Sequence, residues 1–211
     1  MAASGISERG DSFRILAMPL LTKFMFSDDW KIDLYRPQDL PPLLKVQILS
    51  FYRCLWPWGF KGKDQYRDWI TGQADAPQHL VIHHEDTLIS ALCIVSRTIN
   101  FWGQSRKIAG FTGVLVYPNF QKKGVGLKLL ERAIEIAEKD FSVICLHCDP
   151  DQVSFYEKSG FSPLRELKVM EGDPQNPTLN SGVMMIKSQD DSLLHQLKNP
   201  SQPLYFGPYT W

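Results

Sequence analysis

Hydrophobic and polar positions along the chain follow two different periods. Helical spacing predicts one helix from about Gly124 to Lys139 and another from Pro42 to about Leu55. Shorter helices are expected over 63–71, 152–159 and 191–197. Alternating or short apolar runs predict strands over 30–35, 80–84, 88–98, 107–117, 142–148, 165–170 and 183–186. Loops are expected over 56–60 and 172–182 because of their proline and glycine. This order predicts an α/β fold, with a mixed, mostly antiparallel central sheet flanked by helices.

Composition narrows the classes of protein. The chain has 211 residues, of which 44% are hydrophobic, so it can bury a real core. Its 23 basic and 23 acidic residues cancel, which argues against a nucleic-acid binder. The apolar stretch from Ile15 to Phe26 is interrupted by Pro19 and Lys23 and is too short to span a bilayer. We therefore expect a cytoplasmic protein with no membrane or nucleic-acid partner.

The four cysteines are too few for a disulfide scaffold of this size. Cys145 and Cys148 form a C-x-x-C motif, but it lies in a predicted strand and not at a helix start, and no second metal-binding pair accompanies it. We expect reduced, packed thiols and no metal site.

The segment with the clearest chemistry joins the strand that ends at Pro118 to the helix beginning at Gly124. A helix start offers unpaired backbone N–H groups and the positive end of the helix dipole, which together bind anions. Glycines let phosphate oxygens approach the backbone, and adjacent lysines add positive charge. The alternative is that the glycines are needed only for the backbone conformation of the turn and bind no ligand. The residues of this candidate phosphate loop are Gln121, Lys122, Lys123, Gly124, Val125 and Gly126.

Two motifs in this region resemble those of the GNAT superfamily of acyl-CoA-dependent N-acyltransferases. The strand, Pro118 and the Gln121-x-x-Gly124-x-Gly126 loop look like motif A of that superfamily. About thirty residues on, the segment from Asp149 to Phe161, which contains Phe-Tyr-x-x-x-Gly-Phe, resembles its motif B. The two motifs have the usual separation, and the expected helix and strand lie between them.

This resemblance implies roles for particular residues. Acetyl-CoA would be the co-substrate, with its pantetheine arm along the backbone of Val114, Leu115 and Val116 and its pyrophosphate on residues 121–126. Tyr156 matches the tyrosine that protonates the leaving thiolate, and a phenol has a suitable pKa for that task. The alternative for Tyr156 is core packing. A backbone N–H near Leu115 or Val116 would stabilise the oxyanion.

The acceptor side is expected to involve tryptophans. Trp56 and Trp58 lie in the loop after the first long helix, where they would form either an aromatic wall for the substrate or a lid packed on the core. The chain also resembles aminoglycoside 2'-N-acetyltransferases in length, element order and terminal tryptophan, here Trp211. In that family the terminal tryptophan lies in the acceptor cleft. That family's assisting glutamate corresponds to Thr112 here, which cannot accept a proton.

Three side chains are candidate general bases, each acting through water. His147 lies on the strand that follows the long helix and is the first candidate, although a lone strand histidine is more often structural. His84 and Asp149 are the others, and Asp149 has the alternative of capping the next helix.

These observations lead to one functional expectation and two alternatives. We expect an enzyme that transfers an acetyl group from acetyl-CoA to a primary amine of a small molecule by direct attack in a ternary complex. The alternatives are a non-catalytic acyl-CoA sensor and a protein N-acetyltransferase. A homodimer is compatible with the resemblance. The expected parts are an N-terminal extension over 1–25, a GNAT acetyltransferase domain over 26–188, and a C-terminal helix and aromatic tail over 189–211 that folds back on the domain.

Overall fold

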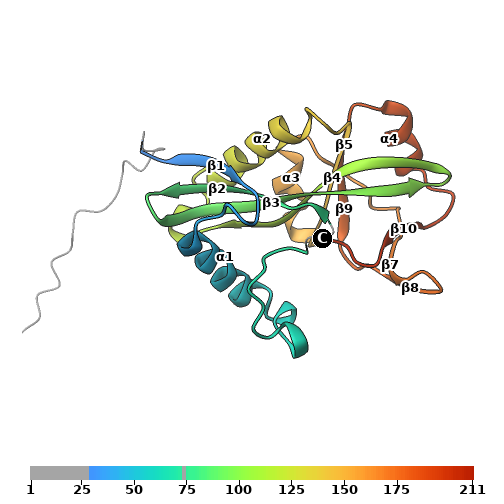
Figure 1. Cartoon of the computed structure of the whole chain (residues 1–211). Coiled ribbons are helices and arrows are strands. Elements are labelled where there is room, and N and C mark those ends of the chain that lie inside the picture. Colours follow the sequence, from blue (N-terminus) through green and yellow to red (C-terminus); the bar gives the residue numbers. More distant parts are fainter. Residues whose placement is uncertain (1–28, 73–74) are drawn as a thin grey trace, which may run out of the picture.

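A computed structural model describes residues 29–72 and 75–211, and Figure 1 shows their arrangement. Seven strands form the main sheet in the order β1-β2-β3-β4-β5-β9-β6, and three form a second sheet in the order β10-β7-β8. The strands of the main sheet are β1 (Lys31–Tyr35), β2 (Gln78–His84), β3 (Thr87–Phe101), β4 (Gln104–Val116), β5 (Val143–Cys148), β6 (Ser162–Pro163) and β9 (Val183–Ser188). Those of the second sheet are β7 (Val169–Asp173), β8 (Asn176–Leu179) and β10 (Leu204–Gly207). The predicted N-terminal extension over 1–25 lies outside the described residues.

Four α-helices and short 3-10 turns connect the strands. The helices are α1 (Pro42–Leu55), α2 (Val125–Ala137), α3 (Val153–Glu157) and α4 (Asp191–Lys198). The 3-10 turns that concern the site are η1 (Pro57–Gly59), η2 (Gly62–Asp64), η4 (Pro118–Phe120) and η5 (Pro150–Gln152). Pairing in the main sheet is antiparallel except between β4 and β5, so the prediction of a mixed, mostly antiparallel sheet flanked by helices is confirmed.

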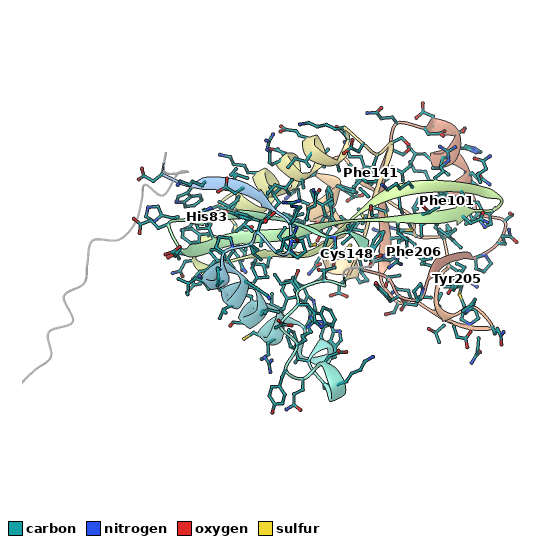
Figure 2. All side chains as sticks on the ribbon, in the orientation of Figure 1. His83, Phe101, Phe141, Cys148, Tyr205 and Phe206 are labelled. Carbon is teal, nitrogen blue, oxygen red and sulfur yellow. The ribbon has the colours of Figure 1, made fainter. Side chains whose placement is uncertain are left out.

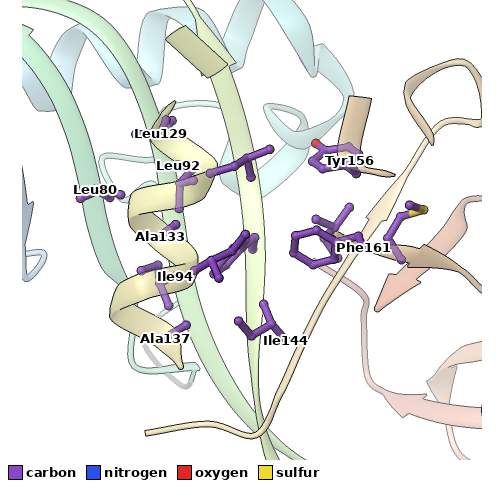
Figure 3. Close-up of a cluster of buried hydrophobic side chains, with 14 of the residues drawn as sticks. Leu80, Leu92, Ile94, Leu129, Ala133, Ala137, Ile144, Tyr156 and Phe161 are labelled. Atoms are coloured by element: carbon purple, nitrogen blue, oxygen red, sulfur yellow. The ribbon is translucent and has the colours of Figure 1, made fainter. Parts of the chain in front are cut away.

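The two sheet faces have separate cores. On one face α2 presents residues four apart, Leu129, Ala133 and Ala137, to Leu92 and other side chains of β2–β5 (Figure 3). Opposite them, α1 buries three residues spaced by four against β2–β4, namely Leu44, Ile48 and Tyr52. A further cluster joins α4 and the second sheet to β3, β5 and β9, and it contains Phe101 and Phe206 (Figure 2).

Three expectations about local structure are wrong. The segment predicted as a helix over 63–71 contains only the short turn η2. The Arg67 guanidinium in this segment stacks over the rings of Phe60 and Trp69, 4.2 and 4.4 Å away, so its contacts do not follow the pattern of an apolar helix face. The loop predicted over 172–182 contains β8, whose proline pairs with Gly172 on the edge of a small sheet, where a missing N–H is tolerated. The strand expected at 165–170 begins only at Val169, and β10 was not predicted.

The cysteines are all free, and Cys145 and Cys148 are buried on β5 as expected from their strand. Within residues 29–72 and 75–211, no helix combines the length and the apolar character needed to span a bilayer.

Candidate acyl-transfer site

The site is organised by the separation of β4 and β5. These parallel strands pair only at Ala109–Ile144 and Gly110–Cys145. Beyond that point β4 stays paired with β3, while β5 diverges, as Figure 3 shows to the right of the β4 ribbon. Phe161 packs between them, with its ring centroid 6.1 Å from that of Phe111 on β4. The edge of β4 from residue 111 to 116 therefore has no ladder partner on the β5 side among the described residues.

A bulge changes the backbone of β4 along this free edge. The register with β3 shifts between the Ala91–Leu115 and Cys93–Thr112 pairs, so that two residues of β4 face one of β3. Gly113 sits in the bulge with a φ of +61°. The hydroxyl of Tyr52 on α1 donates to the Gly113 carbonyl at 3.4 Å and fills the space a side chain there would need. The bulge redirects the backbone groups of residues 113–116, where an oxyanion donor was expected.

The candidate phosphate loop is exposed and ends at a free helix start. Residues 121–124 are exposed, and Lys122 and Gly124 have φ values of +58° and +82°. The first bond that closes a helical turn runs from the Lys128 amide to the Gly124 carbonyl, 3.1 Å, so the amides of residues 125–127 lie ahead of the helical ladder. A Cβ on Gly124 would meet nothing within 4 Å, which leaves room for a ligand.

Two loop residues also make contacts within the protein. A Cβ on Gly126 would lie 3.0 Å from the Phe155 ring, so packing against α3 also favours a glycine here. The Gln121 side chain donates to the Val116 carbonyl at 3.1 Å and ties the loop to the end of β4.

Tyr156 is buried on the α2 face of the sheet. Its ring packs edge-on against Phe155 and Phe161 at centroid distances of 5.0 and 6.3 Å (Figure 3). Burial raises the pKa of the Tyr156 hydroxyl above its ordinary value, and the nearby Cys148 and Asp149 raise it further. The phenol is therefore protonated throughout the physiological range.

His147 points to the opposite face of the sheet. Its neighbours on β5, Leu146 and Cys148, belong to the core under α2, whereas the His147 ring lies edge-on to Phe206 of β10 at 5.2 Å. Burial lowers the pKa of His147 to about 4, against a smaller opposing effect of Glu171. Both ring nitrogens are buried without a hydrogen-bond partner in the described part of the chain. His147 is thus a neutral imidazole with a free lone pair.

The three tryptophans expected at the acceptor side occupy different places. Trp56 packs edge-on against Tyr52 at 4.9 Å and belongs to the core under α1, in line with the lid alternative. Trp58, in η1, is 66% exposed. Trp211 lies against the backbone of Gly110, where no side chain would fit, at the last β4–β5 pair before the strands separate. Its indole nitrogen is buried without a partner in the described residues.

The remaining candidates lie at the surface. His84 is exposed beside the β2–β3 turn. Asp149 is exposed at the start of η5, and its side chain makes no capping hydrogen bond there. Over the described ranges no group of His, Cys, Asp or Glu is arranged to hold a metal ion.

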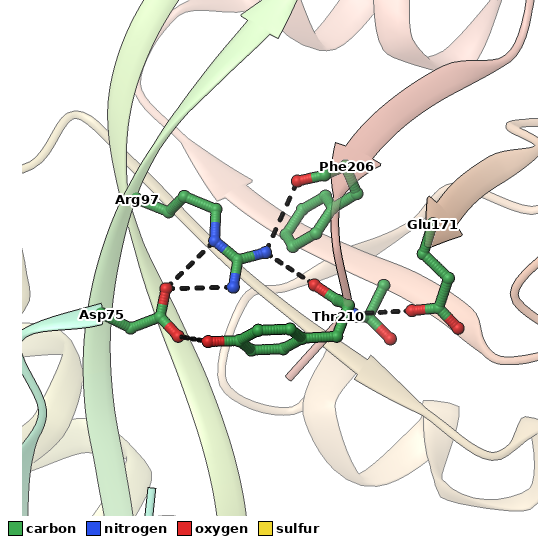
Figure 4. Close-up of polar contacts among 6 residues, drawn as sticks. Asp75, Arg97, Glu171, Phe206 and Thr210 are labelled. Atoms are coloured by element: carbon green, nitrogen blue, oxygen red, sulfur yellow. Dashed lines mark hydrogen bonds and ion pairs between the residues drawn. The ribbon is translucent and has the colours of Figure 1, made fainter. Parts of the chain in front are cut away.

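Sequence reasoning missed the residues that fix the C-terminal tail. Arg97 on β3, Asp75 before β2 and Glu171 on β7 bind the tail around Tyr209 and Thr210 (Figure 4). These residues are far apart in sequence and belong to no local motif, so only the fold brings them together.

The comparisons with known proteins agree with this geometry. A family model described as an acetyltransferase (GNAT) domain matches residues 49–164. The chain belongs to the GNAT acetyltransferase family. Members of this family catalyse acyl transfer and generally use acetyl-CoA. No curated protein sequence is significantly similar to the chain.

Several solved structures share the GNAT fold with this chain. Escherichia coli ElaA superposes with a TM-score of 0.54 at 16% identity, over 75% of this chain and 99% of that one. An acyl-CoA N-acyltransferase from Pseudomonas aeruginosa gives 0.51 at 17% identity, over 75% and 99% of the two chains. A GNAT-family acetyltransferase from Staphylococcus aureus gives 0.51 at 14% identity, over 76% and 100%. At these identities the likeness establishes the fold.

Proposed function

We propose that this GNAT protein transfers an acetyl group from acetyl-CoA to a primary amine of a small molecule. The main support for the proposal is that three features follow one another along the chain. They are the free β4 edge, the bulge at Gly113 and the exposed helix start at Gly124. Together they offer backbone hydrogen bonds for an extended arm and amides for a phosphate at one end of it.

The candidate phosphate loop would hold the pyrophosphate. The amides of residues 125–127 point out of the first turn of α2, and Lys122 and Lys123 supply positive charge from the exposed turn. The open space at Gly124 supports this role, because nothing lies within 4 Å of the place of its Cβ. The backbone of Val114, Leu115 and Val116 would pair with the pantetheine arm. When bound, acetyl-CoA supplies an activated thioester carbonyl.

Two side chains on opposite faces of the sheet would divide the proton transfers. Tyr156, kept protonated by burial, would donate its proton to the departing thiolate on the α2 side. His147, kept neutral by burial, would accept the proton of the attacking amine, directly or through water, on the Phe206 side. The separation of β4 and β5 supports this division, since it leaves the sheet unpaired between the two residues.

Trp211 would form one wall for the acceptor. It lies at the point where β4 and β5 part, and its indole N–H, which has no partner among the described residues, is a hydrogen-bond donor. Trp56 contributes indirectly by supporting Tyr52, while the exposed Trp58 is available to a larger acceptor. Placement of the amine against the thioester would supply much of the rate enhancement.

A thiol-release assay tests the proposal. Purified protein is mixed with acetyl-CoA and a panel of small primary amines, and the acetylated amine is identified by mass spectrometry. We expect amine-dependent CoA release with a matching acetylated product. Binding of acetyl-CoA without release for any amine would favour the sensor alternative, and acetylation of peptide lysines or N-termini alone would favour a protein N-acetyltransferase.

A further inference from the structure

The C-terminal tail, residues 204–211, is bound to both sheets. Here β10 pairs in parallel with β7, and the chain then continues past Gly207 to reach Arg97 on β3 (Figure 4). The last residue, Trp211, ends against Gly110 of β4.

Arg97 is the centre of these contacts. Its Nε donates to the Oδ1 of Asp75 at 3.0 Å, and its Nη2 lies 3.0 Å from the same oxygen in an ion pair. Its Nη1 donates to the carbonyl of Tyr209 at 2.6 Å and to that of Phe206 at 3.5 Å. The other carboxylate oxygen of Asp75 accepts the Tyr209 hydroxyl at 2.5 Å. The side chains of Arg97 and Asp75 are only 13% and 4% exposed. Only a planar guanidinium can make these bonds in several directions at once.

The same guanidinium also faces the aromatic rings of the tail. Its central carbon lies 4.6 Å from the ring of Tyr209, 4.7 Å from that of Trp211 and 5.6 Å from that of Phe206. Such cation–π contacts are strongest when the cation is shielded from water. Phe206 and Trp211 also pack edge-on at 5.0 Å, so the position of Arg97 fixes the arrangement of these rings.

A second anchor holds the residue next to Trp211. The carboxylate of Glu171 accepts the Thr210 amide at 2.6 Å and the Asn180 side-chain amide at 3.3 Å. Asn180 also donates to the Thr210 hydroxyl at 2.7 Å. Glu171 and Asn180 therefore fix Thr210, the residue before Trp211, while Arg97 faces the Trp211 ring itself.

We propose that Arg97, together with Asp75, is a positioning residue for the acceptor amine, which it orders by holding Trp211 at the place where β4 and β5 separate. This inference rests on the proposed function. In this role Arg97 contacts neither substrate. The rings of Phe206, Tyr209 and Trp211 already contact the Arg97 guanidinium, so they do not form an empty aromatic cage for the amine.

The first test measures whether Arg97 holds the tail. Carboxypeptidase A removes an aromatic C-terminal residue only when the end of the chain is accessible. We expect R97K and D75N to release Trp211 at least ten times faster than the wild type under native conditions. The matched control is R106K, which alters the Arg106–Asp190 ion pair (2.9 Å) at the start of α4. Release from R97K and D75N at the wild-type rate would overturn the proposal.

The second test measures whether Arg97 acts through Trp211 on the acceptor. With benzylamine and butylamine as acceptors, R97K should raise the KM for the amine at least tenfold and leave that for acetyl-CoA within twofold. W211A should do the same, and the R97K/W211A double variant should be no worse than W211A, because residues that act as a unit are not additive. Additive effects, an unchanged amine KM or equal changes in both KM values would overturn the proposal.

The two tests also separate this inference from the proposed function. If the wild type acetylates no amine of the panel, the failure lies with the proposed function, and the acceptor role of Arg97 falls with it. The carboxypeptidase rates would still decide whether Arg97 holds Trp211. Thermal unfolding of each variant checks that the protein is folded at the assay temperature.

Discussion

The hydroxyl group of Tyr52 on α1 occupies the space next to Gly113 on β4 that a side chain at position 113 would need. Its hydrogen bond to the Gly113 carbonyl links the helix to the bulge, which redirects the β4 backbone at the proposed site. Burial raises the pKa of Tyr52 far above its ordinary value, so this hydroxyl always has its proton to donate. The helix, the bulge and the site are therefore coupled through one contact.

Gly113→Ala should destabilise the protein severely. The new methyl group would overlap Tyr52, and the residue would keep a φ of +61°, so we expect the free energy of unfolding to fall by about 2–5 kcal/mol. Urea unfolding measures the loss. The matched control is Gly103→Ala, where φ is +98° but a Cβ would meet nothing within 4 Å, so only the backbone cost of about 1–2 kcal/mol applies. Equal losses in the two variants would show that the Tyr52 contact is unimportant.

Much of the fold was predictable because it is encoded locally. The helix after Gly124, the hairpin around Glu85 and the strand ending at Cys148 follow from short-range periodicity, and the structure confirms them. The candidate phosphate loop and Tyr156 lie in two contiguous motifs, and their roles, which the resemblance implies, remain predictions.

The residues around the tail were not predictable in this way. Arg97 meets Tyr209 across 112 positions of sequence, and β10 depends on pairing with β7 and not on its own propensity. Likewise, nothing in the sequence indicates that Phe155 packs against position 126 and favours a glycine there. Such requirements arise from tertiary packing, and the hydrophobic periodicity of a single segment does not reveal them.

Tyr156→Phe should slow acetyl transfer without weakening acetyl-CoA binding. A general acid typically contributes about 100-fold or more to a rate, so we expect kcat to fall by about that factor. Steady-state kinetics at saturating amine measures it. Tyr205→Phe is the matched control, because the Tyr205 hydroxyl binds the Gly172 carbonyl at 2.7 Å in the second sheet. An unchanged kcat in Tyr156→Phe would assign this tyrosine to packing alone.

The stability of the protein should decrease as the pH falls from about 6.5 towards 4. Burial lowers the pKa of both His79 and His147 to about 4, with Lys45 adding to the effect at His79. Between that value and the ordinary one, the unfolded chain binds more protons than the folded protein, so acid favours unfolding. Each histidine contributes a slope of up to about 1.4 kcal/mol per pH unit.

Chemical denaturation at a series of pH values measures this slope. His147→Gln should make this slope shallower by as much as half. If His147→Gln has the wild-type slope, His147 has the same pKa in the folded and the unfolded protein, which would contradict the pKa lowered by burial.

The double variant K122A/K123A should bind acetyl-CoA more weakly in a salt-dependent manner. Both lysines are exposed beside the start of α2, so their attraction for a phosphate is screened by ions. We expect about a tenfold loss of affinity at low salt that shrinks as salt is added. Lys139→Ala, just beyond the other end of α2, is the control. A loss that is independent of salt would point to altered loop structure.

Calorimetric titration tests whether the start of α2 binds the pyrophosphate of acetyl-CoA. Wild type and Gly124→Asp are titrated with acetyl-CoA, with ATP as the anion control and Gly103→Asp as the matched variant at another open, positive-φ glycine. We predict micromolar, CoA-selective binding by wild type and Gly103→Asp and its loss in Gly124→Asp. Absence of binding by the wild type, or full binding by Gly124→Asp, would contradict the account.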